Sequence, residues 1–417
     1  MARSEDHFYD FFLVEKTYWR ICNHTSILTV NGSFPGPTLR VRKGDTAFVN
    51  VHNHGTYGVT IHWHGVKQPR NPWSDGPDFI TQCQISPGTN HTYKVIFSTE
   101  EGTLWWHAHS DWTQSTVYGA IHILPAEGTT YPFPEPDGEH DIILGSWYNY
   151  DVNKKLHYDL YVGADLPSPN AFLINGQPGA YFNCSAEEMH RIIVDYGKTY
   201  LLRIINAALN SEFFFAIAGH NLTVVGMDGS YLKPFITKYL VISPGQTMNV
   251  LLATNQNPSH YYIAGRQFVS AGNIENEEPT AAVLEYIGKY TPPSSPVFPS
   301  SLPVFRDIRA ANAFWARLRS LASKEHSVSV PKHVDHPMFI VVSEKIIACP
   351  NRSCDSDNGN RISSSMNNIT FQNPIANILL AYYRNISGVY TPDFPDFPEV
   401  FMTSQILICL TIILYHP

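Results

Sequence analysis

The sequence repeats itself, and this repeat constrains the fold more than any other feature. Four motifs recur in the same order: TVNGSFPGP as LINGQPG, GDT as GKT, FVNVHN as LRIIN, and ISPGT as ISPGQT. The second and third pairs lie 153 residues apart, as from Gly44 to Gly197, and the fourth pair lies 157 apart. Ordered self-similarity at one spacing indicates that a single structural unit occurs twice.

Each copy consists of short segments rich in Val, Ile, Thr and aromatic residues, such as TAFVNVHN and TYKVIFS, broken by Gly, Pro and Asn. This pattern is typical of a β-sandwich, so we predict two sandwiches joined by the proline-rich residues 131–138. A helix is predicted over about residues 305–322. The net charge of −8 excludes a basic nucleic-acid-binding surface, and no apolar run reaches the roughly 20 residues of a membrane span.

Two histidine pairs mark a candidate metal site. The motif IHWHG contains His62 and His64, and LWWHAH contains His107 and His109. On a strand, residues i and i+2 project from one face, so two such strands side by side would present four imidazoles together. Neutral imidazole binds copper, zinc, iron or nickel. A single HxH motif is more often a hydrated surface pair, which is how we interpret His52-Asn53-His54.

The second copy lacks these histidines. At the 153-residue spacing, His62 aligns with Phe215 and His64 with Ile217, and HYYIAG stands roughly where LWWHAH stands in the first copy. The strands therefore survive without the histidines, so the histidine pairs serve a site rather than the fold.

These motifs resemble the first domain of a plant laccase, a blue multicopper oxidase built from three cupredoxin domains. The likeness includes IHWHGVKQPRNPWSDGP and GTLWWHAHSDW, continues through MDGSYLKPF and GVYTPDFPDFP, and covers about residues 7–398. It implies an all-β fold of tandem cupredoxin-like Greek-key β-sandwiches, two complete and a third incomplete. The implied domains are 7–126 with the copper motifs, 139–290 without ligands, and 291–417 with a linker, a helix and a divergent tail from about residue 399.

The resemblance also implies a function and its cofactor. Laccases oxidise diphenols and monolignol-like phenols, in lignin-related chemistry, while reducing dioxygen to water with four coppers. By position, His62 would bind the type 2 copper, and His64, His107 and His109 the type 3 coppers. Asp75, in WSDGP, matches an acid thought to deliver protons to reduced oxygen, although an Asp-Gly turn is an equally good interpretation of Asp75.

The family completes its copper sites with HPxHLHG and HCHxxxHxxxG motifs, and neither occurs in these 417 residues. His336 begins an HPM sequence without further histidines, and Cys409 is not in an HCH triplet, so we exclude both as ligands. The resemblance thus implies a C-terminally truncated member with at most a partial trinuclear site and little or no turnover. One alternative is another multicopper oxidase such as an ascorbate oxidase, which WWHAH argues against. The other is a non-catalytic, copperless glycoprotein from a truncated gene; the intact histidine motifs argue against an old lineage of that kind and are compatible with recent loss of function.

Cysteines and sequons bear on the compartment. The resemblance implies a Cys22–Cys184 disulfide, Cys349 and Cys354 are close enough for a local bridge, and Cys83 is expected to be a free thiol. Eight N-x-S/T sequons favour a secreted, glycosylated protein of the apoplast. They are at Asn23, Asn31, Asn90, Asn183, Asn221, Asn351, Asn368 and Asn385. The N-terminus has no apolar signal-peptide segment, so we expect that segment to be missing from this chain. We expect a monomer that binds small phenols and dioxygen, without nucleic acid or a membrane span.

Overall fold

The computed structural model describes residues 4–164, 168–179, 189–270, 278–349, 351, 354–355, 359–391, 393–398 and 408–414. The chain divides into two compact units, which we describe separately. The double-sandwich unit comprises Met1–Asp78, Gln84–Val152 and Ser168–His326, and the C-terminal unit comprises Phe79–Cys83, Asn153–Pro167 and Ser327–Pro417. Among the described residues, no helix is long and apolar enough to cross a membrane.

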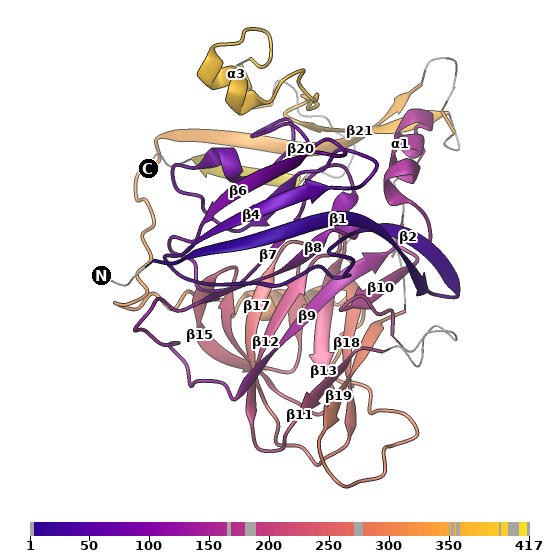
Figure 1. The fold of residues 1–417 in the computed structure, drawn as a ribbon, viewed down its shortest axis with the longest axis vertical. Coiled ribbons are helices and arrows are strands. Elements are labelled where there is room, and N and C mark those ends of the chain that lie inside the picture. Colours follow the sequence, from indigo (N-terminus) through magenta and orange to yellow (C-terminus); the bar gives the residue numbers. More distant parts are fainter. Residues whose placement is uncertain are drawn as a thin grey trace. The chain divides into compact units, whose positions relative to one another are not determined.

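The first sandwich pairs two four-stranded sheets (Figure 1). One sheet has the order β2 (Asn23–Val30), β1 (Asp6–Arg20), β4 (Thr46–Asn53) and β6 (Asn90–Ile96). The other has the order β3 (Leu39–Arg42), β8 (Tyr118–Leu124), β7 (Gly102–Ala108) and β5 (Ile61–His64). Alternate residues of both sheets fill one apolar core, which includes the fully buried Trp63 and Trp106. Short 3-10 turns, η1 (Pro72–Ser74) and η2 (Thr113–Ser115), interrupt the loops.

The second sandwich has the same strand connections with additional edge strands. Its first sheet has the order β10 (Ala171–Ile174), β9 (Gly138–Trp147), β12 (Thr199–Asn206), β17 (Thr247–Ala253), β14 (Leu222–Met227) and β15 (Ser230–Thr237). Its second has the order β11 (Arg191–Val194), β19 (Thr280–Tyr286), β18 (His260–Phe268), β13 (Glu212–Ile217) and β16 (Leu240–Ile242). The predicted fold class, all-β with tandem cupredoxin-like sandwiches, is confirmed.

Each sandwich repeats one arrangement of parallel and antiparallel neighbours. Strand β1 runs parallel to β4 as β9 runs parallel to β12, and β3 runs parallel to β8 as β11 runs parallel to β19. A third apolar cluster contains residues of both sandwiches, among them Trp105, Tyr118 and Trp147. The two sandwiches therefore share buried surface.

The predicted helix over 305–322 is shorter in the structure, where α2 spans Ile308–Trp315. Asp307 caps its N-terminus, because the side chain accepts a hydrogen bond from the Ala310 N–H. A turn at residues 316–317 follows the helix, and beyond it the Lys233 N–H of β15 donates to the Arg319 carbonyl. Pairing with this sheet edge outweighs the helix propensity of the remaining residues.

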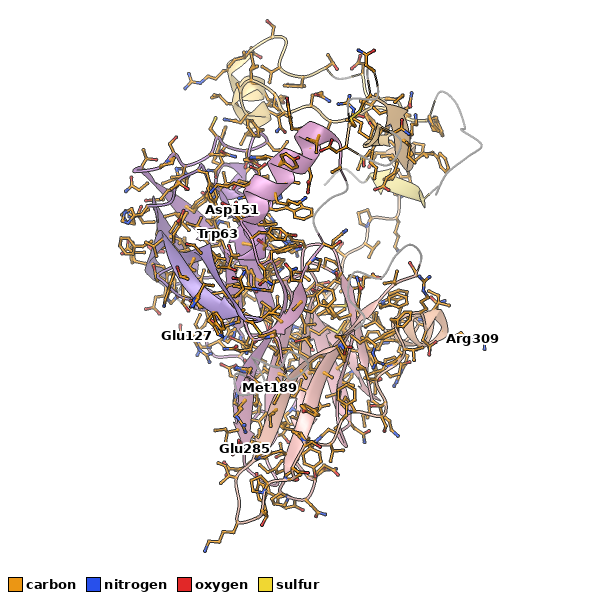
Figure 2. The ribbon with its side chains drawn as sticks, turned by 90° about the vertical axis from the view of Figure 1, so that its right-hand side faces the viewer. Trp63, Glu127, Asp151, Met189, Glu285 and Arg309 are labelled. Carbon is orange, nitrogen blue, oxygen red and sulfur yellow. A yellow bond between two sulfur atoms is a disulfide. The ribbon has the colours of Figure 1, made fainter. Side chains whose placement is uncertain are left out.

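Figure 2 shows Arg309 on this helix, Trp63 in the first sandwich and Glu285 on β19 of the second.

The C-terminal unit contains β20 (His336–Ala348) between β21 (Asn360–Met366) and β22 (Ile408–Leu414), both antiparallel to it. It also contains two helices that the sequence analysis did not predict, α1 (Val152–Val162) and α3 (Ile378–Arg384). Strand β22 lies within the segment predicted to be a divergent tail.

One turn occurs three times along the chain. Asn31, Asn175 and Asn367 all have positive φ, at 55°, 49° and 46°. Each side-chain oxygen accepts a hydrogen bond from a backbone N–H on the facing strand; the donors are Phe12, Ile143 and Val341. Asparagine tolerates this left-handed conformation better than most residues. The third occurrence, after β21, supports the expected start of a third repeat, whose boundaries stay a prediction.

Candidate metal centre

Strands β5 and β7 hold the histidine motifs next to each other. They pair antiparallel, with His62 opposite His107 and Trp63 opposite Trp106. Because side chains alternate along a strand, the two tryptophans enter the core of the first sandwich and the histidines leave it on the other face. The Trp106 indole N–H also donates to the Pro37 carbonyl at 3.0 Å. Burial of the tryptophans therefore fixes the direction of the histidines.

Three of the four predicted histidines converge. The ligand nitrogens of His62, His64 and His107 all lie within 4.8 Å of one another, and His64 Nδ1 is 3.3 Å from His107 Nε2. His109 lies beside them but is exposed and outside this group. Its ring centroid is 5.4 Å from that of His62 and 5.8 Å from that of His107.

Backbone carbonyls fix the tautomers of two of these histidines. His62 Nδ1 lies 2.7 Å from the Asp75 carbonyl oxygen, and His107 Nδ1 lies 2.8 Å from the Ala108 carbonyl oxygen. A carbonyl only accepts hydrogen bonds, so each Nδ1 carries the proton and each Nε2 keeps its lone pair. A carbonyl that accepts a hydrogen bond from the other ring nitrogen orients a metal-binding histidine in this way.

Burial keeps the three imidazoles uncharged. It lowers the pKa of His64 to about 4, with smaller contributions from His62 and His109. Burial also lowers the pKa of His62 and lowers that of His107 strongly. All three are therefore neutral at neutral pH, the form that binds a metal.

The donor set fits an ion that prefers imidazole. Two nitrogens bound to one tetrahedral ion at roughly 2.0–2.1 Å lie about 3.3–3.4 Å apart, and His64 Nδ1 and His107 Nε2 are separated by 3.3 Å. A set of neutral imidazoles suits copper or zinc better than calcium or magnesium, which prefer oxygen.

Asp75 contacts His62 mainly through its backbone. Its carboxylate Oδ1 is 3.6 Å from His62 Nδ1, whereas its carbonyl oxygen is at 2.7 Å. Gly76, which follows, has φ of +102°, and a Cβ there would lie 1.9 Å from the Ile61 carbonyl oxygen. The Asp-Gly pair thus forms a turn pressed against β5, and the side-chain acid also lies near the site.

The second sandwich contributes to the site, which the sequence analysis missed. The Trp105 ring packs against His64 and His107, at centroid distances of 5.2 and 4.3 Å. Its indole N–H donates to the carbonyl of Gly245 at 3.0 Å. The only sequence signal was the repeated ISPG motif, whose second copy contains Gly245.

Strand register corrects the alignment of the second copy. Phe215 pairs with Gly265 on β13 and β18, as His62 pairs with His107 on β5 and β7. The position of His107 is therefore taken by Gly265 and that of His109 by Gln267, two residues beyond the approximate alignment with HYYIAG. None of the four equivalent positions in the second sandwich has a histidine.

Five of the six cysteines fall into three groups. Cys349 and Cys354 form a disulfide with their Cα atoms 5.9 Å apart. Cys22 is disulfide-bonded, and its predicted partner Cys184 lies outside the described residues. Cys83 is an exposed free thiol, and Asn377 Nδ2 lies 3.8 Å from its sulfur within the C-terminal unit.

Comparison with known proteins gives consistent matches. Residues 13–128 and 138–289 each match a family described as multicopper oxidase. "Putative laccase-9" from Oryza sativa subsp. japonica is 50% identical over 408 residues, covering 94% of this chain and 70% of that protein. "Laccase-14" from Arabidopsis thaliana is 44% identical, covering 95% of this chain and 70% of that protein.

Solved structures share the fold. Fet3p, titled a multicopper oxidase that functions in iron import, has a TM-score of 0.70 at 21% identity, covering 89% of this chain and 65% of its own. A laccase from Botrytis aclada has a TM-score of 0.67 at 23% identity, covering 92% and 68%. The chain thus spans about 65–70% of the length of these four proteins.

Proposed function

Since the chain belongs to the multicopper oxidases, and within them to the laccases, we propose that β5 and β7 supply half of a copper cluster at which dioxygen is reduced. The observation that carries this proposal is the convergence of His62, His64 and His107. The matched position in the second sandwich has no histidine, so this convergence is not a by-product of the fold.

The individual roles follow the family pattern. We propose His62 as a type 2 copper ligand and His64, His107 and His109 as type 3 ligands. Copper bound there would supply one-electron redox chemistry toward dioxygen. The chain's own residues hold neutral imidazoles in place, and the Asp75 carboxyl, 3.6 Å from His62 Nδ1, is close enough to hold a proton beside the site.

The partners and compartment are proposed on the same basis. We propose small phenols, diphenols and monolignol-like compounds, as electron donors, and dioxygen as the acceptor. We further propose secretion to the apoplast as a monomeric glycoprotein, which the eight sequons support.

Copper titration of the purified chain tests the proposal. We expect copper uptake that falls at least tenfold in affinity in His64→Ala and His107→Ala, measured by competition with a chelator and by the electron paramagnetic resonance spectrum. A double variant of the histidine pair outside the site, the half-buried His52→Ala with the exposed His54→Ala, is the matched control and should leave this site unchanged. Equal uptake by wild type and both site variants would refute the proposed function.

Phenol oxidation is a separate measurement. A type 1 copper requires a thiolate and two imidazoles, and these 417 residues contain no HCH triplet. We therefore expect this polypeptide to oxidise phenols no faster than its His64→Ala variant. Turnover above that control would show that electrons enter by a route that these residues do not suggest.

A further inference from the structure

We propose that the Pro-Gly turn of the second sandwich, Ser243–Gln246, positions His64, and that Gly245 is the positioning residue. A Cβ on Gly245 would lie 2.9 Å from His64 Cε1 and 3.0 Å from His64 Nε2. The imidazole therefore rests against a surface that only glycine leaves open. This inference deepens the proposed function, because it concerns the same copper site.

The turn is held rigidly. The Gln246 N–H donates to the Ser243 carbonyl at 3.1 Å, and Gly245 has φ of +83°, as the third residue of a type II turn requires. The Gly245 N–H donates to the Asn206 carbonyl at 2.9 Å. Its backbone cannot move away from His64 without breaking these hydrogen bonds.

Trp105 ties this turn to the histidines. Its indole N–H donates to the Gly245 carbonyl at 3.0 Å, and its ring packs on both His64 and His107. His64 thus has the turn on one side and the indole on another, which restricts its rotamer before any ion binds. Such pre-organisation is what a precise metal site needs.

Two buried hydrogen bonds anchor β17, which follows the turn, to β7. The Thr247 hydroxyl donates to the Thr103 carbonyl at 2.6 Å. The Thr103 hydroxyl donates to Asn249 Oδ1 at 2.6 Å. The second sandwich, which has no counterparts of the four site histidines, is therefore fixed to the strand that contains His107, and it forms part of the wall of the site.

The first sandwich supplies an internal control. Gly88 has the same place in the first Pro-Gly turn, where the Thr89 N–H donates to the Ser86 carbonyl at 3.1 Å, and its φ is +77°. No atom lies within 4 Å of a Cβ built on Gly88. Both glycines satisfy the turn, but only Gly245 also makes room for a histidine.

The experiment compares Gly245→Ala with Gly88→Ala in the full chain, by copper affinity and the paramagnetic resonance spectrum. Both variants strain a turn, so both should lose stability. Only Gly245→Ala should lower copper affinity, by at least tenfold, and change the copper hyperfine splitting. Equal affinity and equal spectra for the two variants would overturn the inference.

A second variant guards against misfolding of Gly245→Ala. Trp105→Phe removes the N–H that holds the Gly245 carbonyl without adding a Cβ, and it should lower copper affinity several-fold; an unchanged affinity would count against the inference. Failure of the proposed function can be distinguished from failure of this inference alone. If His64→Ala binds copper as wild type does, the proposed function fails and the inference fails with it. If His64 matters but Gly245 and Trp105 do not, the inference alone fails.

Discussion

Asn53 and Asn206 occupy the same position in the two sandwiches and make the same three hydrogen bonds. Each is fully buried at the end of its strand, and each side chain donates to two backbone carbonyls and accepts from the N–H two residues further on. The carbonyls are those of Tyr57 and Ile85 for Asn53, and of Ser211 and Ile242 for Asn206. The accepted N–H groups belong to Gly55 and Ala208.

Replacing either asparagine should therefore destabilise the chain. Asn53→Ala or Asn206→Ala removes three buried hydrogen bonds, and each such bond contributes about 0.5–1.5 kcal/mol to stability. We expect a loss of about 3 kcal/mol in the free energy of unfolding for each variant, measured by urea denaturation. The exposed Asn221→Ala should change it by less than about 0.5 kcal/mol. A loss below about 1 kcal/mol in either buried variant would contradict this account.

The turn that holds His62 should tolerate no side chain at Gly76. A Cβ there would lie 1.9 Å from the Ile61 carbonyl oxygen, so the Asp75 carbonyl would have to leave His62. Gly44 has a similar φ, +98° against +102°, but open space around its Cβ. Gly44→Ala should cost only the strain of a left-handed residue, about 1–2 kcal/mol. Gly76→Ala should cost clearly more and also weaken copper binding, as thermal unfolding and copper titration would show.

An ion pair of the second sandwich, between Arg203 on β12 and Glu139 on β9, is linked by hydrogen bonds of Arg203 to the first sandwich. Arg203 is fully buried, and its Nε donates to Glu139 Oε2 at 2.9 Å. Its Nη1 donates to the Gly102 carbonyl and the Thr103 hydroxyl of β7. Burial alone would raise the pKa of Glu139, but hydrogen bonds from His122, Arg203 and Arg40, with the charge of Arg203, hold that pKa well below its usual range.

Glu139→Gln should show how much this ion pair contributes to the free energy of unfolding, because that contribution depends on pH. It leaves Arg203 buried without a countercharge, and we expect a loss of about 2 kcal/mol at pH 7, since the Glu139 side chain is 25% exposed. The unfolded chain protonates Glu139 near about pH 4.3. The stabilisation is therefore complete above about pH 5 and is lost as the pH falls toward the folded-state pKa. The difference between wild type and variant should be constant from about pH 6 to 8 and shrink below about pH 4; Glu135→Gln, at an exposed site, is the control.

The sequence predicted the site best where the two-residue alternation of side chains along a strand decides which residues share a face. Alternation along β5 and β7 requires His62 and His64 to share one face, and His107 to share a face with His109. The lack of their counterparts in the second copy indicated that the site was not structural. Periodicity gives no cross-strand register, however, so the equivalence of Gly265 with His107 required the observed pairing.

Contacts between segments that are far apart in the sequence could not be predicted from the sequence. The predicted helix over 305–322 had a suitable composition, but residues 319–321 pair with β15 instead. The contact of Gly245 with His64 was hidden for a similar reason. The positive φ of a Pro-Gly turn is by itself a sufficient reason for a glycine. Nothing in the motif therefore distinguishes Gly245, which borders the site, from Gly88, which does not.

Asp75 offers a test of which of its atoms matters for metal binding. Loss of an outer partner of a metal-binding histidine typically costs 10–100-fold in affinity. Here the atom nearest to His62 Nδ1 is the backbone carbonyl, at 2.7 Å, rather than the carboxylate, at 3.6 Å. Asp75→Asn keeps the backbone and the size of the side chain, so copper affinity should stay within about threefold of wild type, whereas His62→Ala should lose at least tenfold. A tenfold loss in Asp75→Asn, measured by the same chelator competition, would mean that the carboxylate charge, and not the carbonyl, maintains the imidazole as a ligand.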